Sequence, residues 1–481
     1  MRQGDVEDPD RAEAALRRAE ADGVSGEALA ERLDEVAVAH RRRFWDAGDE
    51  RHLERAVEAY RRAMTVDAAN RTAWAHELAL VLTDRYDVSG DLDVLAEARR
   101  IAREALDGAE EGSEPWAHRA ATLVLCLWDL YDATGALTEL DAALGLGTRA
   151  LAALPRTARG WARVCSNLAM LRLDRHERLC EDEDLQAGVR LAQDAVTAAH
   201  EDDPELAGWL SNLGTALLTR FGTQFPDRAL PMPGERVDLT DLDAAIAAYR
   251  RAIEVSEWGM AGRATFLSNL GNALVDRAEI LRLGGLVEQS EPALREAVDA
   301  LAEAVAITAS AAPYRASRLN VLGEAQRAVS EVSGAEEDVE AARTSFREAC
   351  TTGLSIAPEM TLAAADNWIR WSVRRAAWDE AGEADRYLLR AAEALHRAQA
   401  LRSHREAWLV ASRGLAQEGA YALTRAGRPE AAAVRLERGR AVLLSEELGL
   451  VPALLGRLPD ALQRRYTEAV RRVQSALRDA G

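Results

Sequence analysis

The chain repeats itself roughly every 45 residues. Four stretches share one set of offsets: a glycine five residues, an aliphatic residue ten residues and an alanine thirteen residues after the first position. These stretches begin at Arg43, Arg85, Leu130 and Val329. A fifth copy from Arg175 keeps the offsets but has Cys180 and Gly188 in place of the glycine and the alanine. A fixed period of this length is the signature of stacked helical units, and it predicts one elongated all-α array.

Each unit is expected to open with a first helix, numbered here so that the residue that begins the copy is position 14. Position 7 is then a large aliphatic residue in seven units: Val36, Leu78, Leu123, Leu168, Leu213, Leu270 and Leu322. Position 8 is small in most of them: Ala37, Ala79, Val124, Ala169, Gly214, Gly271 and Gly323. This pairing lets one helix backbone approach its neighbour while the aliphatic side chain fills the remaining space. The glycine after position 14 supplies the positive φ of a helix end, and a second amphipathic helix follows it.

Two intervals between successive position 7 residues are longer than the others. After each of them the repeat pattern resumes with its usual spacing. The extra residues fall near 222–236 and 283–292, between the two helices of a unit. The first stretch holds three prolines and is expected to be a loop, either functional or a tolerated surface insertion.

The resulting prediction is an all-α, right-handed helical solenoid of about nine helix pairs with a further C-terminal helix. Residues 1–26 are expected to form an N-terminal arm or cap, with a short helix from Asp10 to Ala21. Repeats occupy 27–358, degenerate repeats 359–449 and a basic helix 450–481. The segment from Arg435 to Arg478 has nine Arg against five acidic residues. It is interpreted as docking on the acidic array, contacting a partner domain, or forming a solvated amphipathic helix.

Composition limits the classes of function. The net charge is −20, and all 60 basic residues are Arg, which excludes a P-loop lysine and a Schiff-base lysine. The acidic balance disfavours nucleic acid as a partner. The four cysteines form no CxxC pair, the first twenty residues are charged throughout, and no apolar run reaches the ~18 residues that span a membrane. We therefore expect a cytoplasmic protein without a membrane segment.

No residue pattern indicates catalysis, a metal or a cofactor. His176 and Cys180 are the nearest approach to a nucleophile pair, but the acidic residues around them oppose formation of a thiolate. The acidic run from Glu181 to Asp184 lacks the ligand spacing of an EF-hand and is interpreted as a solvated helix start. The eight histidines show no HExxH motif.

The pairs of helices, with an aliphatic residue at position 7 and a small one at position 8, resemble tetratricopeptide repeats. The sequences of two units, from Ser211 to Arg220 and from Ser268 to Arg277, resemble the "SNLGxALxxR" units of long actinobacterial proteins. In those proteins the repeats precede a caspase-like CHAT protease domain. The stretch from Leu436 to Glu446 resembles the "ERGRAxLLS" segment that lies between repeats and protease there. The sequence ends at Gly481, before such a domain would start, so no catalytic residue is carried over and the chain itself is expected not to be an enzyme.

The resemblance implies a protein or peptide partner, either a CHAT-type protease domain or its activator, bound in a concave groove. The alternatives are the ligand-sensing array of a bacterial transcriptional regulator and a purely structural assembly module. The oligomeric state is left open, as is the choice between a truncated and a stand-alone chain.

A ladder of Ser–Asn pairs is the best candidate for a functional set of residues. Positions 5 and 6 of three successive units are Ser166–Asn167, Ser211–Asn212 and Ser268–Asn269. In tetratricopeptide arrays this face lines the groove, where an amide side chain offers both a donor and an acceptor to a peptide. The alternative is hydrogen bonding between helices that fixes the stack. Arg163, Asn272 and Asp276 are expected on or beside the same face.

Overall fold

The computed structural model describes residues 8–47, 49–225, 237–256, 262–310, 312, 314–398 and 415–437. The chain divides into two compact units, Met1–Ala309 and Ser310–Gly481. Every regular element among the described residues is helical. The predicted C-terminal basic helix at 450–481 and most of the stretch that resembles "ERGRAxLLS" lie outside the described residues.

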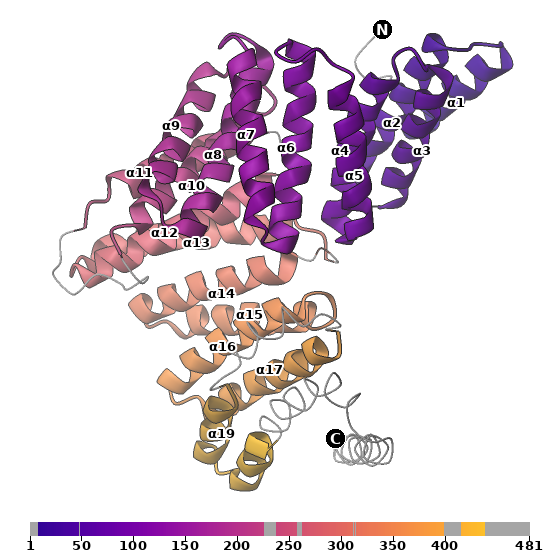
Figure 1. The fold of residues 1–481 in the computed structure, drawn as a ribbon. Coiled ribbons are helices and arrows are strands. Elements are labelled where there is room, and N and C mark those ends of the chain that lie inside the picture. The colour runs from indigo at the N-terminus through magenta and orange to yellow at the C-terminus, as the bar shows by residue number, and fades with distance from the viewer. Residues whose placement is uncertain are drawn as a thin grey trace, which may run out of the picture. The chain divides into compact units, whose positions relative to one another are not determined.

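The first unit consists of one leading helix and six helix pairs (Figure 1). The leading helix is α1 (Pro9–Ala21), within the predicted N-terminal cap. The pairs are α2 (Glu27–Ala47) with α3 (Arg51–Val66), α4 (Arg71–Ser89) with α5 (Leu92–Asp107), α6 (Glu114–Thr134) with α7 (Leu137–Ala153), α8 (Arg159–Leu179) with α9 (Asp182–Ala198), α10 (Leu206–Gly222) with α11 (Thr240–Val255), and α12 (Arg263–Leu283) with α13 (Val287–Ala306).

The second unit continues the same alternation over its described residues. Its pairs are α14 (Tyr314–Ser333) with α15 (Glu336–Ile356) and α16 (Pro358–Arg374) with α17 (Trp378–Ala398). Helix α19 (Leu415–Arg425) is followed by helical residues 429–437, and Gly427 between them has a φ of +74°. The prediction of an all-α solenoid of about nine pairs is confirmed.

The predicted pairing of a large and a small residue holds the two helices of each pair together. The position 7 side chains are buried in six units, and Leu213 is half-buried. Where position 8 is glycine, at Gly214, Gly271 and Gly323, it faces a large side chain of the second helix in the same pair, whereas in α6–α7 position 8 is Val124 and the second helix contributes Gly147. A Cβ added to Gly214 would lie 2.6 Å from the Tyr249 ring, and one added to Gly271 would lie 2.4 Å from Leu301 Cγ. The side chains of the second helices therefore occupy the space that a larger residue at position 8 would need.

The turn after the first helix has the predicted left-handed conformation. Gly90 and Gly135 end α4 and α6 with φ values of +62° and +68°, and each donates its N–H to the carbonyl four residues earlier. Cys180 ends α8 in the same way with a φ of +57°. A side chain at this φ is uncommon, so the repeat imposes the conformation even where the residue is not glycine.

The two insertions differ in structure. The first leaves α10 after Gly222, and residues 226–236 lie outside the described residues. At its base, the Gln224 side chain makes two hydrogen bonds to the backbone of Asp238, at 2.9 and 3.2 Å. The second, expected near 283–292, is largely helical: α13 begins at Val287 and contains Pro292. The extra residues lengthen the two helices instead of forming a loop.

Two glycines of α10 provide a test of the packing at position 8. Gly208→Ala should raise the free energy of unfolding by up to about 1 kcal/mol, because a Cβ there meets nothing within 4 Å and alanine favours the helix. Gly214→Ala should lower it by about 1–3 kcal/mol, because the new Cβ overlaps the Tyr249 ring. Urea titrations followed by circular dichroism measure both. Equal effects of the two variants would contradict this account of the contact.

Candidate binding face

The first helices of the first unit form its inner layer. Successive first helices contact one another directly, from α4 to α6, α8, α10 and α12. The second helices are joined instead by long side chains. Salt bridges of this kind are Arg61–Glu97 at 2.7 Å, Arg99–Glu139 at 3.4 Å and Arg250–Glu296 at 2.7 Å. Because successive first helices pack directly against one another and, among the described residues, successive second helices do not, the stack curves toward the first helices. The face that they present is therefore the concave one.

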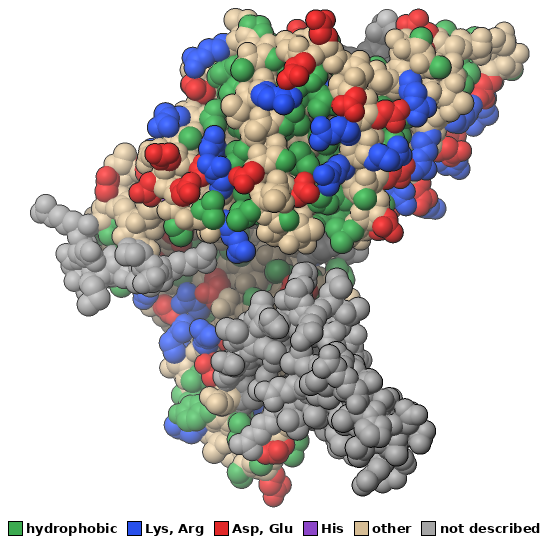
Figure 2. All heavy atoms as spheres, viewed as in Figure 1, with side chains coloured by type: hydrophobic (Ala, Val, Ile, Leu, Met, Phe, Trp, Pro, Cys, Tyr) green, Lys and Arg blue, Asp and Glu red, His purple; other side chains and the backbone are tan. Residues whose placement is uncertain are grey.

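Positions 2, 6, 9, 13 and 16 lie on one side of a helix, because they are spaced by three or four residues. These positions of α2, α4, α6, α8, α10 and α12 define the first-helix face. Charged side chains of both signs are interspersed elsewhere on the first unit, as Figure 2 shows for the side turned to the viewer. On the first-helix face, by contrast, apolar and acidic residues lie in separate rows.

The Ser–Asn ladder makes hydrogen bonds between units. Asn212 Nδ2 donates to Ser166 Oγ of the preceding first helix at 2.9 Å, and Asn269 Nδ2 donates to Ser211 Oγ at 3.3 Å. At the same positions of the preceding units, Thr122 Oγ1 of α6 lies 3.1 Å from His76 Nδ1 of α4. Hydrogen bonds of this kind are what we expect if the ladder fixes the stack of helices. The amides are half-buried, so a role toward a ligand stays a prediction.

The other predicted residues are not gathered into one site. Asn167 makes no side-chain hydrogen bond within the described part of the chain, since the residue at position 5 of α6 is Ala121. Ser268 Oγ donates to the Ala264 carbonyl of its own helix at 2.8 Å. Arg163 is exposed and forms a bidentate ion pair with Glu205 at the start of α10. The remaining two, Asn272 and Asp276, are exposed on α12.

An apolar stripe runs along position 9 of the first helices, and the sequence analysis did not identify it. Its members are Val38, which is 45% exposed, and the half-buried Leu80, Leu125 and Met170. They come from four successive first helices, α2 to α8. The hydrophobic residues of positions 3, 7 and 11 lie inside the stack, whereas this stripe keeps access to solvent.

An acidic band runs beside this stripe at positions 13 and 16, and it too was missed. It comprises the pairs Asp84–Asp87, Asp129–Asp132 and Asp174–Glu177 on α4, α6 and α8. The sequence signal is the repeated pattern D-x-x-[DE] at the end of the first helix, which occurs again at Asp276–Glu279. Among 80 acidic residues the pattern is visible only once the units are aligned by position.

Two acids of the band have partners from the neighbouring first helix. Asp84 is buried and accepts from the Arg41 guanidinium of α2. Asp174 accepts from Trp128 Nε1 of α6. Asp87 and Asp129 have no hydrogen-bond or ion-pair partner among the described residues.

Several acids at positions 13 and 16 have raised pKa values. Burial, followed by the charges of Asp87 and Asp132, raises the pKa of Asp129 to about 7. Burial also raises the pKa of Asp87, Asp174 and Asp276 to about 6 in each case. Asp87 and Asp276 keep wide access to solvent, which screens their charges, so the cost of desolvation falls mainly on the half-buried Asp129 and Asp174.

The acidic band opposes folding in three ways. Acids three residues apart repel each other, and acids near a helix C-terminus face the negative end of the helix dipole. Partial burial adds a desolvation cost for Asp129 and Asp174. Asp84 and Asp174 are compensated by their partners, but Asp87 and Asp129 have no such compensation within the described residues. An arrangement of this kind is typical of surfaces that bind a cationic group.

The geometry at His176 and Cys180 gives no catalytic pair. His176 Nδ1 contacts the Glu181 carbonyl at 2.9 Å, and Cys180 is exposed at the helix end. The other three cysteines, Cys126, Cys165 and Cys350, are buried. The described residues contain no group of three or more His, Cys, Asp or Glu side chains able to hold a metal ion. None of the described helices combines the length and apolar composition that crossing a bilayer requires.

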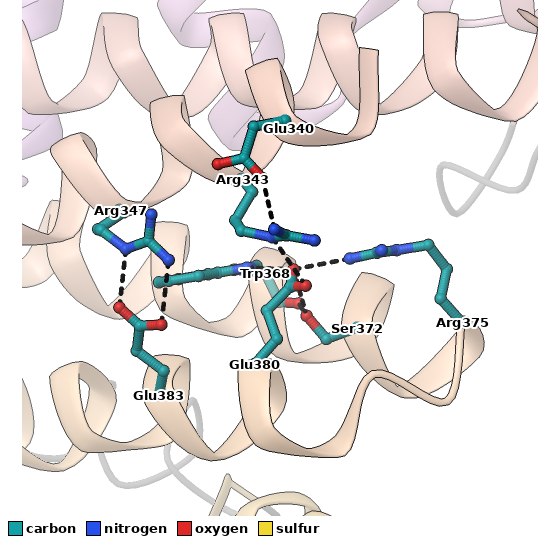
Figure 3. Close-up of polar contacts among 8 residues, drawn as sticks. All are labelled: Glu340, Arg343, Arg347, Trp368, Ser372, Arg375, Glu380 and Glu383. Atoms are coloured by element: carbon teal, nitrogen blue, oxygen red, sulfur yellow. Dashed lines mark hydrogen bonds and ion pairs between the residues drawn. The ribbon is translucent and has the colours of Figure 1, made fainter. Parts of the chain in front are cut away.

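The densest polar cluster of the second unit fixes helices to one another (Figure 3). Glu380 of α17 accepts hydrogen bonds from Trp368 Nε1 at 2.7 Å, Ser372 Oγ at 3.0 Å and Arg375 at 2.7 Å, all from α16 and its C-terminal end. Arg343 of α15 pairs with the other carboxylate oxygen at 3.1 Å. Both oxygens of Glu380 have partners, so this carboxylate offers no free acceptor to a ligand.

No protein-family model and no curated protein matches the sequence. Solved structures with a similar fold include BtubC (BKLC) from P. vanneervenii, at 17% identity over 52% of this chain and 89% of that one, with a TM-score of 0.35. The S. pombe nuclear import adaptor Nro1 has 14% identity over 60% and 96%, with a TM-score of 0.39. The human IFIT1 dimer with PPP-AAAA has 10% identity over 90% of both chains, with a TM-score of 0.44. Similarity at this level shows no family and no function for this chain.

The hydrogen bonds of the ladder predict a graded effect on stability. Asn212→Ala and Asn269→Ala together should lower the free energy of unfolding by about 1–3 kcal/mol, since each removes one bond to a serine of the preceding helix. Asn167→Ala is the matched control and should have little effect, because it has no such bond. Thermal unfolding followed by circular dichroism measures both. A control as destabilised as the double variant would contradict the structural role.

Neutralising Asp129 should stabilise the chain. Its folded pKa of about 7 lies above the unfolded value, so the folded state loses stability as the pH rises from about 4 through 7. Asp129→Asn removes that loss and should raise the free energy of unfolding by about 1 kcal/mol at pH 8, with no gain near pH 4. Thermal unfolding between pH 4 and 8 measures the difference. Asp202→Asn, at an exposed acid between α9 and α10, is the control; destabilisation by Asp129→Asn at pH 8 would refute the argument.

Proposed function

We propose that this protein is an interaction scaffold that binds a cationic, amphipathic segment of a protein partner along the first-helix face of Met1–Ala309. The observation that carries the proposal is the apolar stripe at position 9 lying beside the acidic band at positions 13 and 16, in which Asp87 and Asp129 have no partner among the described residues. Each row spans at least three successive first helices, so an extended or helical segment meets both rows at once.

The two rows supply different parts of the binding free energy. Apolar side chains of the partner would be removed from water on Leu80, Leu125 and Met170, which contributes roughly 25 cal/mol per Å² of buried area. Arg or Lys side chains would pair with the acids and relieve the repulsion between Asp87 and Asp129. The excess negative charge would also speed the encounter with a cationic partner and repel nucleic acid.

The resemblance to CHAT-associated repeats supplies a candidate partner. We propose that the chain acts in the cytoplasm as the regulatory part of a CHAT-type protease system, binding the protease domain or its activator. On this proposal the chain itself carries out no catalysis, and occupation of the first-helix face regulates a protease encoded in cis or in trans.

A designed peptide pair tests the class of ligand. The probe is an 18-residue amphipathic helix of leucine and arginine with a fluorescent label, and its counterpart has glutamate in place of arginine. Fluorescence anisotropy should show binding of the arginine peptide that weakens with added salt and as the pH falls below about 7, because Asp129 then becomes protonated. Equal binding of the glutamate peptide would exclude a cationic ligand.

Two double variants test where on the chain the peptide binds. Asp87→Asn with Asp132→Asn should weaken binding of the arginine peptide by roughly tenfold, as expected for the loss of two favourable charge pairs. Glu201→Gln with Asp202→Asn removes the same charge from the turn before α10 and should change affinity by less than about twofold, through long-range attraction alone. Similar losses in both variants would mean that the peptide responds to net charge and not to this face.

The CHAT assignment needs a separate measurement. Affinity capture from an actinobacterial lysate, with the 1–481 chain as bait and mass spectrometry as the readout, should recover a CHAT-domain protein. The Asp87/Asp132 variant should lose it, and the Glu201/Asp202 variant should retain it. Capture of a different cationic protein with the same variant pattern would support the scaffold and reject the CHAT partner.

A further inference from the structure

The row of side chains at position 16 changes its chemistry at one end of the first-helix face. On α4, α6 and α8 this position is acidic, as Asp87, Asp132 and Glu177. On α2 it is Trp45, whose side chain is 46% exposed. Tryptophan side chains are highly buried on average in folded proteins, so this exposure is unusual.

Trp45 and Val38 form one apolar patch on α2. Seven residues, or about two turns, separate them, so they lie on the same side of the helix. Val38 is 45% exposed and is also the first member of the apolar stripe at position 9. The buried Phe44 packs edge-to-face against Trp45, with ring centroids 5.1 Å apart and an angle of 62° between the rings. This contact holds the indole ring in place and leaves its outer side open.

The charge of the face also changes at this end. Position 13 is acidic on α4, α6 and α8, as Asp84, Asp129 and Asp174, whereas on α2 it is Arg42. The neighbouring Arg41 of α2 pairs with Asp84. The first-helix face is therefore apolar and cationic at α2 and acidic over α4 to α8. A cationic side chain of a partner is favoured over the acidic part, and an apolar one is favoured over α2.

The spacing of the first helices selects the form of the partner segment. A segment that follows the two rows crosses one first helix after another, and α4, α6 and α8 contact one another in that order. Helices in contact have axes about 8–10 Å apart. Seven residues of an α-helix cover about 10.5 Å and return to the same side, whereas a strand returns to the same side every two residues, or about 7 Å. A helix with a heptad repeat therefore presents an equivalent residue to each first helix in turn.

We propose that the partner segment is an α-helix of four heptads, in which three cationic heptads lie over α4, α6 and α8 and a terminal apolar heptad without a cation packs on Val38 and Trp45. This inference rests on the proposed function and adds the form of the partner and the order of its residues along the face. Each cationic heptad places an apolar residue on position 9 and an Arg or Lys toward positions 13 and 16. Trp45 anchors the apolar end, since tryptophans that become buried on binding commonly dominate the affinity.

Designed peptides with a fluorescent label test the order of the heptads on the full chain. The short peptide has three heptads of leucine and arginine. Two long peptides add a fourth heptad of leucine and glutamine without arginine, at the N-terminus in one and at the C-terminus in the other, so that both directions along the face are sampled. Fluorescence anisotropy should show that one long peptide binds about tenfold more tightly than the short one. Equal affinities of all three peptides would overturn the proposal.

Variants of the chain show whether the extra affinity comes from α2. Trp45→Ala should weaken the tighter long peptide by about tenfold and the short peptide by less than about twofold. Trp45→Phe keeps an aromatic anchor and should retain most of the affinity. Leu286→Ala removes an equally exposed side chain, 45% accessible and located between α12 and α13, and should change neither peptide. Equal effects of Trp45→Ala on both peptides would overturn the proposal. If Trp45→Ala does not fold, Val38→Ala gives the same test.

A proline at the centre of the tighter long peptide tests its helical form, with alanine at the same position as the control. Proline interrupts a helix and should weaken binding at least tenfold, whereas alanine should leave it unchanged. Unchanged binding of the proline peptide would indicate an extended segment and overturn the helical partner, while the proposed function would stand. Failure of the short peptide to bind would instead reject the proposed function itself, and this inference with it.

Discussion

The close contact between the two helices of each pair is the constraint on which the rest of the structure depends. A small residue at position 8 lets a bulky side chain of the second helix reach the first helix backbone, as Tyr249 does at Gly214 and Leu301 at Gly271. This contact sets the distance between the layers and fixes which side of the first helix is buried. The opposite side, at positions 2, 6, 9, 13 and 16, is left for solvent or a partner.

Curvature of the first unit follows from how closely successive helices approach one another in each layer. Serine, threonine and asparagine side chains are short, so the bond from Asn212 to Ser166 holds successive first helices close together. Arginine and glutamate are long, so a bridge such as Arg250–Glu296 spans the wider spacing between second helices. The closer approach of successive first helices bends the stack and brings position 9 and position 13 residues of neighbouring units onto one concave face.

The sequence predicts the units well and the candidate face only in part. Spacing alone identifies the helix pairs, the core positions and the unusual turn at Cys180, because each rests on contacts within one unit. It places the second insertion between the two helices, whereas α13 begins at Val287 and accommodates Pro292 within the helix. It also misses the acidic band, because a single pair such as Asp129–Asp132 resembles any solvated helix end. Whether such a pair has a compensating partner depends on the side chains of the neighbouring units. Those neighbours are known only once the units are stacked.

The acidic band and the stack impose opposite requirements on the same helices. The interior of these first helices agrees with the fold in volume, periodicity and turn chemistry, whereas the last two turns of α4, α6 and α8 carry acids that repel one another, some of them partly desolvated. Asp84 shows that the repeat is able to compensate such an acid, since Arg41 from the preceding helix reaches it. At Asp129, position 12 of the preceding helix is Thr83, which supplies no cation. The compensating charge is therefore missing at the centre of the face, where a cationic side chain of a partner would lie between Asp87 and Asp129.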